Sequence, residues 1–413
     1  MARDLRLFYL FRLLSTSYLY VPVSVFFAID RGLDFQQVMT LVAIGSVVII
    51  AVDLPTGALA DRIGRRRSML AGALCLVAAS LTFYVAHSFW VFAIAVSLAA
   101  ASLALCSGAD SAYLFDLLHE NGRGEEYPRL EGTASAFHLT GNAVAFALGG
   151  ALGHFFGLSL PYLVNAGVAM AALFVAFSMR EGRAATPQPI DRARTYRADM
   201  YAAMRISFRQ HGLRWAILYS SLIFLLLRGT EKIYQPYLES HGFNLLHIGF
   251  VFAGVYTVAA VVAHNVHALR GHVSEAALIW GLLSVLVVTF FLLGIVSGSV
   301  PLLIVLAFQA GVTGLYSPLI KPLLNREIAD SSRRATVLSV ESTVRRLAFA
   351  SFALVLGWVI ETKSPAAGLL LSGAVGIVAG AVLLFARREA RTAARSPAVV
   401  GVVAISDQSR EVA

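Results

Sequence analysis

Long apolar stretches recur along the whole chain, and short polar segments separate them. A helix needs about 20 apolar residues to cross the hydrocarbon core of a bilayer. Twelve stretches reach that length, at residues 5–29, 36–60, 68–86, 90–118, 130–156, 158–179, 214–238, 246–269, 274–297, 300–324, 336–360 and 365–386. The pattern therefore predicts an all-α integral membrane protein with twelve transmembrane helices, joined mostly by short connections.

One connection interrupts this regular spacing. The polar, arginine-rich segment at residues 181–213 follows the sixth stretch and lies near the middle of the chain. It predicts two six-helix bundles, at residues 1–180 and 214–388, joined by a cytoplasmic linker. A tail at residues 389–413 follows, and we expect it to be disordered and cytoplasmic.

Arginine is distributed unevenly between the two sides that these spans define. Every connection on the side of the N-terminus carries arginine, whereas the opposite connections carry only Arg31 and Lys363. Cytoplasmic loops of membrane proteins carry an excess of Lys and Arg. The asymmetry predicts a multi-pass protein of the cell inner membrane with both termini in the cytoplasm.

The composition excludes several classes of protein. The chain is 58% hydrophobic and 14% charged, with a mean hydropathy of +0.73, whereas soluble domains carry about 25% charged residues. Its net charge of +9 follows from the cytoplasmic arginines, and no soluble basic domain is predicted that would bind nucleic acid. Cys75 and Cys106 lie inside apolar stretches, so we predict no disulfide framework, no metal site and no cofactor.

The turn between the second and third stretches is the most distinctive segment. It reads Gly57-Ala-Leu-Ala-Asp61-Arg62-Ile-Gly64-Arg65-Arg66-Arg67. The two glycines permit a tight reversal and close approach of helices. A carboxylate at the position of Asp61 can lie against the N-terminus of a helix, and the eleventh span begins at residues 331–333 with good capping residues. We predict that this contact latches the two halves together on the cytoplasmic side.

This turn resembles the signature loop of the major facilitator superfamily, Gly-x-x-x-Asp-Arg-x-Gly-Arg-Arg/Lys. The family has two six-helix halves that hold substrate between them near the midplane. The resemblance implies a conformational latch that includes an acidic residue at the inner end of the fourth span, here Asp116, with Arg65 as its partner. The latch residues are then Gly57, Asp61, Arg62, Gly64, Arg65, Arg66 and Asp116. The preceding segment, residues 53–57, is similar to drug-exporter-like bacterial members.

A second segment, in the fifth span, is similar to the antiporter motif of the same family. It reads Gly141-x-x-x-Ala145-Phe146-x-x-Gly149-Gly150, with Ala-Phe in place of the central Gly-Pro. A glycine face for close helix packing explains the same residues equally well. Antiport and simple packing are therefore both open interpretations of this segment.

Ionisable side chains inside the spans are functional candidates, because a charge in the membrane is costly unless it is paired or hydrated. Asp110 has no opposite charge within one turn of its own helix, so it needs water, a partner such as Arg12, or a proton. A desolvated carboxylate has a raised pKa and can exchange protons near neutral pH. We predict Asp110 as the leading proton-coupling residue, followed by Glu231 and Asp53.

The remaining polar groups of the spans are candidates for a substrate cavity. Spacings of three and four residues allow Arg228 to meet Glu231, and Arg345 to meet Glu341, as structural ion pairs. An unpaired Arg228 would instead suit an anionic or zwitterionic solute. The predicted cavity residues are Arg12, Arg228, Tyr234, Gln235, Gln309, Glu341 and Arg345.

These features predict a secondary active transporter that moves a small amphipathic organic solute by alternating access, with proton-coupled export as the leading direction. The alternative is proton-coupled uptake of an anionic or zwitterionic molecule. The chain has no His-Glu-x-x-His, no Gly-x-Ser-x-Gly and no phosphate-binding loop, so a membrane enzyme is disfavoured, as is a non-transporting receptor. The expected partners are the solute, protons and the lipid bilayer, and we expect the monomer to function alone.

Overall fold

The structure is a computed structural model that describes residues 1–181, 201, 203–266, 273–296, 298–328 and 334–394. Within these ranges, side chains are not described at residues 54–63, 335 and 388–394. Most of the predicted linker and tail, and the helix start at residues 331–333, thus lie outside the described residues.

The described residues form helices joined by turns, as the apolar pattern predicts. The first half contains α1 (Ala2–Ser15), η1 (Val21–Val23), α2 (Ser24–Asp30), α3 (Phe35–Ile63), α4 (Arg65–Tyr84), α5 (Phe89–Cys106), α6 (Ala109–Glu120), η2 (Gly124–Glu126), α7 (Tyr127–Phe156) and α8 (Leu160–Ser178). The second half contains α10 (His211–Ser240), α11 (Leu245–His264), α13 (Glu275–Ile295), α14 (Ser299–Glu327), α15 (Arg334–Thr362) and α16 (Pro365–Ala394). Eleven helical stretches of the described residues are long and apolar enough to cross a membrane. This confirms the predicted all-α membrane fold.

The first predicted span, residues 5–29, is not one continuous helix, and that expectation was wrong. The chain leaves the helix after α1 and becomes helical again only at η1 and α2. The Thr16 hydroxyl donates to a carbonyl of its own helix, which competes with the backbone, and Pro22 has no N–H to donate. Between them, the N–H of Leu19 donates to Asn165 Oδ1 at 3.1 Å. A neighbouring helix therefore satisfies the backbone that the break exposes.

The fourth predicted span, residues 90–118, is also divided. Gly108 lies between α5 and α6 with a φ of +82°, a conformation that side-chain-bearing residues rarely adopt. The interruption places Asp110 in the first turn of α6. Apolar length alone does not show this break, because the break depends on the backbone angle of a single glycine.

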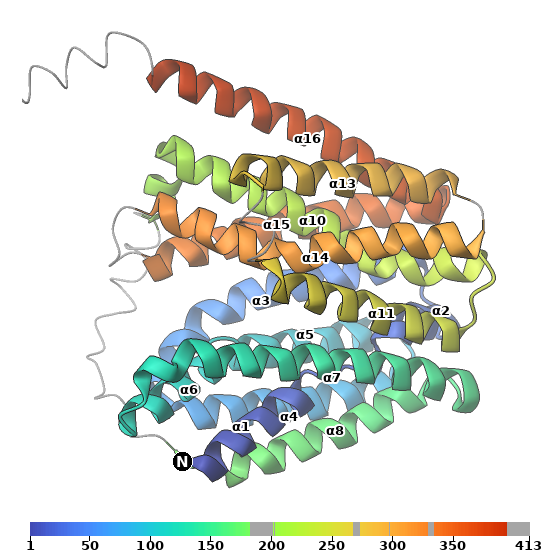
Figure 1. Ribbon diagram of the computed structural model, residues 1–413. Helices are drawn as coiled ribbons and strands as arrows, with labels where there is room; N and C mark the ends of the chain where they lie inside the picture. The colour runs from blue at the N-terminus through green and yellow to red at the C-terminus, as the bar shows by residue number, and fades with distance from the viewer. Residues whose placement is uncertain (182–200, 202, 267–272, 297, 329–333, 395–413) are drawn as a thin grey trace, which may run out of the picture.

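The two halves meet along two pairs of helices. Figure 1 shows α1 and α4–α8 on one side of the molecule, α10 and α13–α16 on the other, and α3 and α11 between them. α3 packs along α15, and α7 packs along α11, so each pair joins one half to the other. A space between the halves is thus bordered by α3, α7, α11 and α15.

The pairing of α7 with α11 depends on glycine. A Cβ atom added at Gly150 would lie 2.6 Å from the Cα of Gly249, and one added at Gly249 would lie 2.8 Å from the Cα of Gly150. A Cβ at Gly141 would lie 2.9 Å from the carbonyl oxygen of Leu13. Close packing thus accounts for glycines of the segment that is similar to the antiporter motif, without reference to transport direction.

We expect Gly249→Ala to destabilise the protein by about 1–3 kcal/mol, because the new methyl group overlaps the backbone of α7. Gly254→Ala is the matched control on the same helix, since a Cβ there meets nothing within 4 Å. Thermal unfolding in detergent should show a lower melting temperature for Gly249→Ala alone. Equal melting temperatures of the two variants would contradict this account of the interface.

Candidate functional site

A cavity of about 410 Å³ lies between the two halves, and we call it the central cavity. Both halves contribute to its wall, through α2, α3, α5 and α7 on one side and α10, α11 and α15 on the other. Its size is within the range of pockets that hold small organic molecules. The cavity is therefore the candidate site for a solute.

One side of the central cavity is aromatic. Tyr20 stacks on Tyr162 with ring centroids 4.9 Å apart, and Phe83 lies 5.3 Å from Tyr162. The helix break after α1 places Tyr18 and Tyr20 in this wall. Further aromatic side chains of the wall are Phe92, Phe146, Phe224, Tyr256 and Phe349. Such a surface suits the apolar body of a ligand.

The other chemical feature of the central cavity is a group of charged side chains, Arg228, Glu231, Lys232 and Arg346. Arg228 Nη1 lies 2.7 Å from Glu231 Oε2, so these two form the ion pair that their spacing predicts. Lys232 Nζ donates to Ser24 Oγ, across the interface between the halves, at 2.9 Å. Within the described part of the chain, Arg346 makes no hydrogen bond and no ion pair, and its Nε is buried. Three cations thus face one carboxylate.

Of the seven predicted cavity residues, Arg228 alone is in the described wall, and the other six lie elsewhere. Tyr234 donates to Gln309 Oε1 between α10 and α14, and the Nε2 of Gln309 is buried without a partner among the described residues. Gln235 is buried and bonds to the backbone of η1 and α2. Arg12, Glu341 and Arg345 take part in two polar clusters and are not among the described wall residues. Spacing along one helix cannot distinguish a side chain that faces a cavity from one that faces a neighbouring helix.

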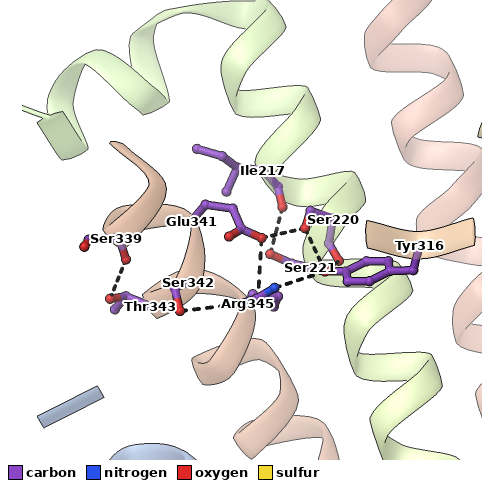
Figure 2. A network of polar contacts seen from close by, with 9 residues as sticks. All are labelled: Ile217, Ser220, Ser221, Tyr316, Ser339, Glu341, Ser342, Thr343 and Arg345. Atoms are coloured by element: carbon purple, nitrogen blue, oxygen red, sulfur yellow. Dashed lines mark hydrogen bonds and ion pairs between the residues drawn. The ribbon is translucent and has the colours of Figure 1, made fainter. Parts of the chain in front are cut away.

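Glu341 lies in a buried polar network of α10, α14 and α15, which Figure 2 shows. Ser220 Oγ donates to Glu341 Oε1 at 2.5 Å and lies 3.1 Å from the hydroxyl of Tyr316. Arg345 lies 3.7 Å from the same carboxylate and 3.3 Å from that hydroxyl. Its guanidinium also lies over the ring of Phe224, at 4.5 Å. The network holds the C-terminal helices together from inside.

Asp110 pairs with Arg12, one of the three possibilities that the sequence left open for it, and both side chains are mostly buried. A second carboxylate, Glu131 of α7, lies 4.0 Å from the same guanidinium. Ser111 Oγ donates to Glu131 at 2.8 Å, whereas the other Glu131 oxygen is buried without a partner among the described residues. We call Arg12, Asp110 and Glu131 the shared-arginine cluster. Sequence reasoning missed Glu131, although it lies inside the predicted fifth span.

Part of the predicted latch is described. Arg65 Nε lies 3.7 Å from Asp116 Oδ2, so the two side chains that the family resemblance pairs are in contact. Gly64 has a φ of +100° and makes the reversal between α3 and α4. Arg66 donates to the carbonyls of Ala176 and Phe177 at 3.0 and 2.6 Å, which caps the end of α8. Gly57 lies in the segment 54–63, whose side chains are not described, and so do Asp61 and Arg62. The expected partner of Asp61 also lies outside the described residues.

The opposite end of the molecule joins the two halves by hydrogen bonds. Gln235 accepts from the N–H of Val25 at 2.8 Å and donates to the carbonyl of Val21 at 2.9 Å. Glu361 accepts from the N–H of Phe35 at 2.8 Å. We call this set, with the Lys232–Ser24 bond, the seal. The seal lies at the end of the molecule where α3 begins and α15 ends. Arg65 and Asp116 lie at the opposite end, where α3 ends and α4 begins.

Comparisons with known proteins agree with this arrangement. The family described as Major Facilitator Superfamily matches residues 7–275. Among curated proteins, no sequence matches the chain.

Solved transporter structures share the fold. A mutant of the nucleoside transporter NupG has a TM-score of 0.80 at 10% identity, over 93% of this chain and 98% of that one. A POT family transporter in complex with 5-aminolevulinic acid has a TM-score of 0.70 at 14% identity, over 92% and 95%. The human organic anion transporter MFSD10 has a TM-score of 0.64 at 18% identity, over 92% and 99%. At these identities the likeness shows the fold.

We expect Ser220→Ala to lower stability by about 1–2 kcal/mol, because it leaves the buried Glu341 carboxylate without its nearest donor. Ser221→Ala is the matched control, since Ser221 Oγ bonds only to the carbonyl of Ile217 in its own helix among the described residues. The measurement is thermal unfolding of the two purified variants. A loss for Ser221→Ala as large as that for Ser220→Ala would contradict a special role of the network.

Proposed function

Since the chain belongs to the major facilitator superfamily, we propose that it is a secondary active transporter that moves a small organic solute with an apolar body by alternating access. The observation that carries the proposal is the central cavity, whose wall comes from both halves and combines aromatic and charged side chains. A site between two halves is exposed to one side or the other when the halves rock against each other. This is the arrangement that alternating access requires.

The distribution of charge supports an orientation for this cycle. The described end that carries Arg65, Arg66 and Arg67 is the arginine-rich end, and the seal lies at the other. Under the positive-inside rule, the arginine-rich end and both termini face the cytoplasm of the inner membrane. The seal then closes the outer side of the cavity.

The shared-arginine cluster supports coupling to protons. Two carboxylates, Asp110 and Glu131, flank one guanidinium, so the cluster carries one negative charge in excess when both are ionised. A proton bound by the cluster would neutralise this excess charge, which is costly inside a membrane. We rank Glu231 and Asp53 behind Asp110, because Glu231 has Arg228 as a close counter-charge, whereas Asp110 shares one guanidinium with a second carboxylate.

We propose export as the direction, on the similarity of residues 53–57 to exporter-like members. Proton-coupled uptake is the second candidate. The packing of Gly141 and Gly150 favours uptake, because it explains these glycines without an antiporter motif. Flux measured under pH gradients of opposite sign separates the two directions.

We expect Asp110→Asn to abolish transport driven by a pH gradient while leaving exchange of solute across the membrane intact. An amide cannot take up and release a proton, although it can still accept a hydrogen bond from Arg12. The measurement is flux in proteoliposomes of a solute selected by a thermal-stability ligand screen. Asp30→Asn, an exposed position at the end of α2, is the control. Full gradient-driven transport by Asp110→Asn would overturn its assigned role.

The latch supplies a second prediction for the transport cycle. We propose that Arg65 and Asp116 stabilise the cytoplasmic turn, so Asp116→Asn should lower the transport rate severalfold. Because the pair is partly exposed, its loss should change the free energy of unfolding by at most about 1 kcal/mol. Glu275→Gln breaks the exposed pair with Arg326 and is the control. An unchanged transport rate in Asp116→Asn would remove the latch from the mechanism.

A further inference from the structure

We infer that the central cavity selects organic anions, and that Lys232 and Arg346 are the groups that receive the anionic group of the solute. The inference rests on the proposed transport function and adds the chemical class of the solute. It concerns organic acids with a carboxylate, sulfonate or phosphate group, because these share the same geometry toward ammonium and guanidinium donors.

The charges of the wall do not cancel. Arg228 and Glu231 form a close ion pair and neutralise each other, so Arg228 by itself gives no argument for an anion. Lys232 and Arg346 remain as cations of the same wall, from two different helices. The described wall thus carries two formal positive charges in excess, with His138 neutral. A charge inside the membrane is costly unless a counter-charge or water reaches it, and a bound anion would supply that counter-charge.

The hydrogen bonds of Lys232 leave donors free for a ligand. An ammonium group has three donors, and the described residues provide Lys232 with one acceptor, Ser24 Oγ. That oxygen donates its own proton to the carbonyl of Val21 and also lies within reach of Gln235. Ser24 has no further capacity to offset the charge of Lys232. An anionic oxygen in the cavity could accept from the remaining donors.

Arg346 presents a similar case from α15. Its guanidinium has five donors, and its buried Nε has no hydrogen-bond partner among the described residues. Asp53 of α3 and Glu341 of α15 are the acidic groups whose charges act on it, together with the cations Arg345 and Arg228. No ion pair within 4.0 Å joins Arg346 to a described carboxylate. An organic acid would offer the planar, bidentate partner that guanidinium prefers.

The aromatic side of the cavity defines the rest of the solute. Tyr20 stacks on Tyr162, Phe83 packs against Tyr162 at a tilt, and Phe92 meets Phe83 edge-on. A planar apolar body against these rings would place its acidic group toward the cations of α10 and α15. The volume of about 410 Å³ accommodates one or two fused rings with an acidic substituent.

The experiment compares three probes that share one ring system and differ in charge: naphthoate, naphthamide and naphthylmethylammonium. We expect calorimetric titration of the purified protein to give an affinity for naphthoate at least about tenfold higher than for the other two, because charge-assisted hydrogen bonds are the strong ones. This comparison uses the unmodified chain and needs no variant to fold. Equal affinities, a preference for the ammonium probe or no binding of naphthoate would each overturn the inference.

Variants then test the named residues. Lys232→Gln and Arg346→Gln should each weaken naphthoate binding about tenfold and leave naphthamide binding unchanged. Glu231→Gln should strengthen naphthoate binding, because it removes the one carboxylate of the described wall. Lys321→Gln, at an exposed lysine of α14 outside the described wall, is the matched control and should change nothing. Unaltered naphthoate binding in both Lys232→Gln and Arg346→Gln would overturn the assignment.

Flux measurements keep the two proposals apart. Anion-selective binding without flux of naphthoate in proteoliposomes would overturn the transport function and support the anion site. Gradient-driven flux of a cationic solute with no selectivity for naphthoate would support transport and overturn the anion site.

Discussion

The cost of placing charge inside a membrane is the constraint on which this structure depends. Each ionisable group in the spans must find a counter-charge, a hydrogen-bond donor or a water-accessible cavity. Asp110 has Arg12, Glu231 has Arg228, and the Glu341 carboxylate has Ser220. These pairs sort the intramembrane charges into those that hold helices together and those that face the cavity. The shared-arginine cluster and the cations of the cavity wall are the places where the charges do not balance, so a proton or a solute can act there.

The sequence allowed most of the fold to be predicted and less of the site. Apolar length identifies spans because a helix is the only structure that satisfies its backbone alone in lipid. The same signal does not show the breaks after Ser15 and at Gly108. At the first break the N–H of Leu19 bonds to Asn165 of another helix, and the second depends on the backbone angle of one glycine. Pairs on one helix, such as Arg228 with Glu231, follow from spacing. Gln235 points toward η1 and α2 of the other half, and Gln309 points toward α10 of its own half. Both directions follow from tertiary packing, which a local sequence pattern does not contain.

Lys232 connects the cavity with the seal. Its ammonium group lies in the cavity wall and also donates across the interface to Ser24, beside the bonds of Gln235 to Val21 and Val25. A solute that draws this ammonium toward itself weakens one of the bonds that join α10 to α2. Binding of a solute in the cavity would thereby weaken the seal directly, through one residue that belongs to both. A ligand shifts a protein between two states only if it binds one state better than the other. A solute that competes with Ser24 for Lys232 would bind better when the seal is open.

The two proposed charge sites lie in different halves and have opposite formal excess. The shared-arginine cluster belongs to the N-terminal half and has one negative charge in excess, whereas the cations of the cavity wall come from α10 and α15. A proton would relieve the first site and an organic anion the second, so each ligand offsets the desolvation cost of a different half. When both sites are filled, the halves carry less uncompensated charge as they move past each other through the low-dielectric membrane. On this argument, joint occupancy lowers the barrier to reorientation more than either ligand alone, and it favours movement of proton and anion in the same direction. For a cavity that selects anions, the charge distribution therefore favours uptake. The exporter-like sequence of residues 53–57 favours the opposite direction.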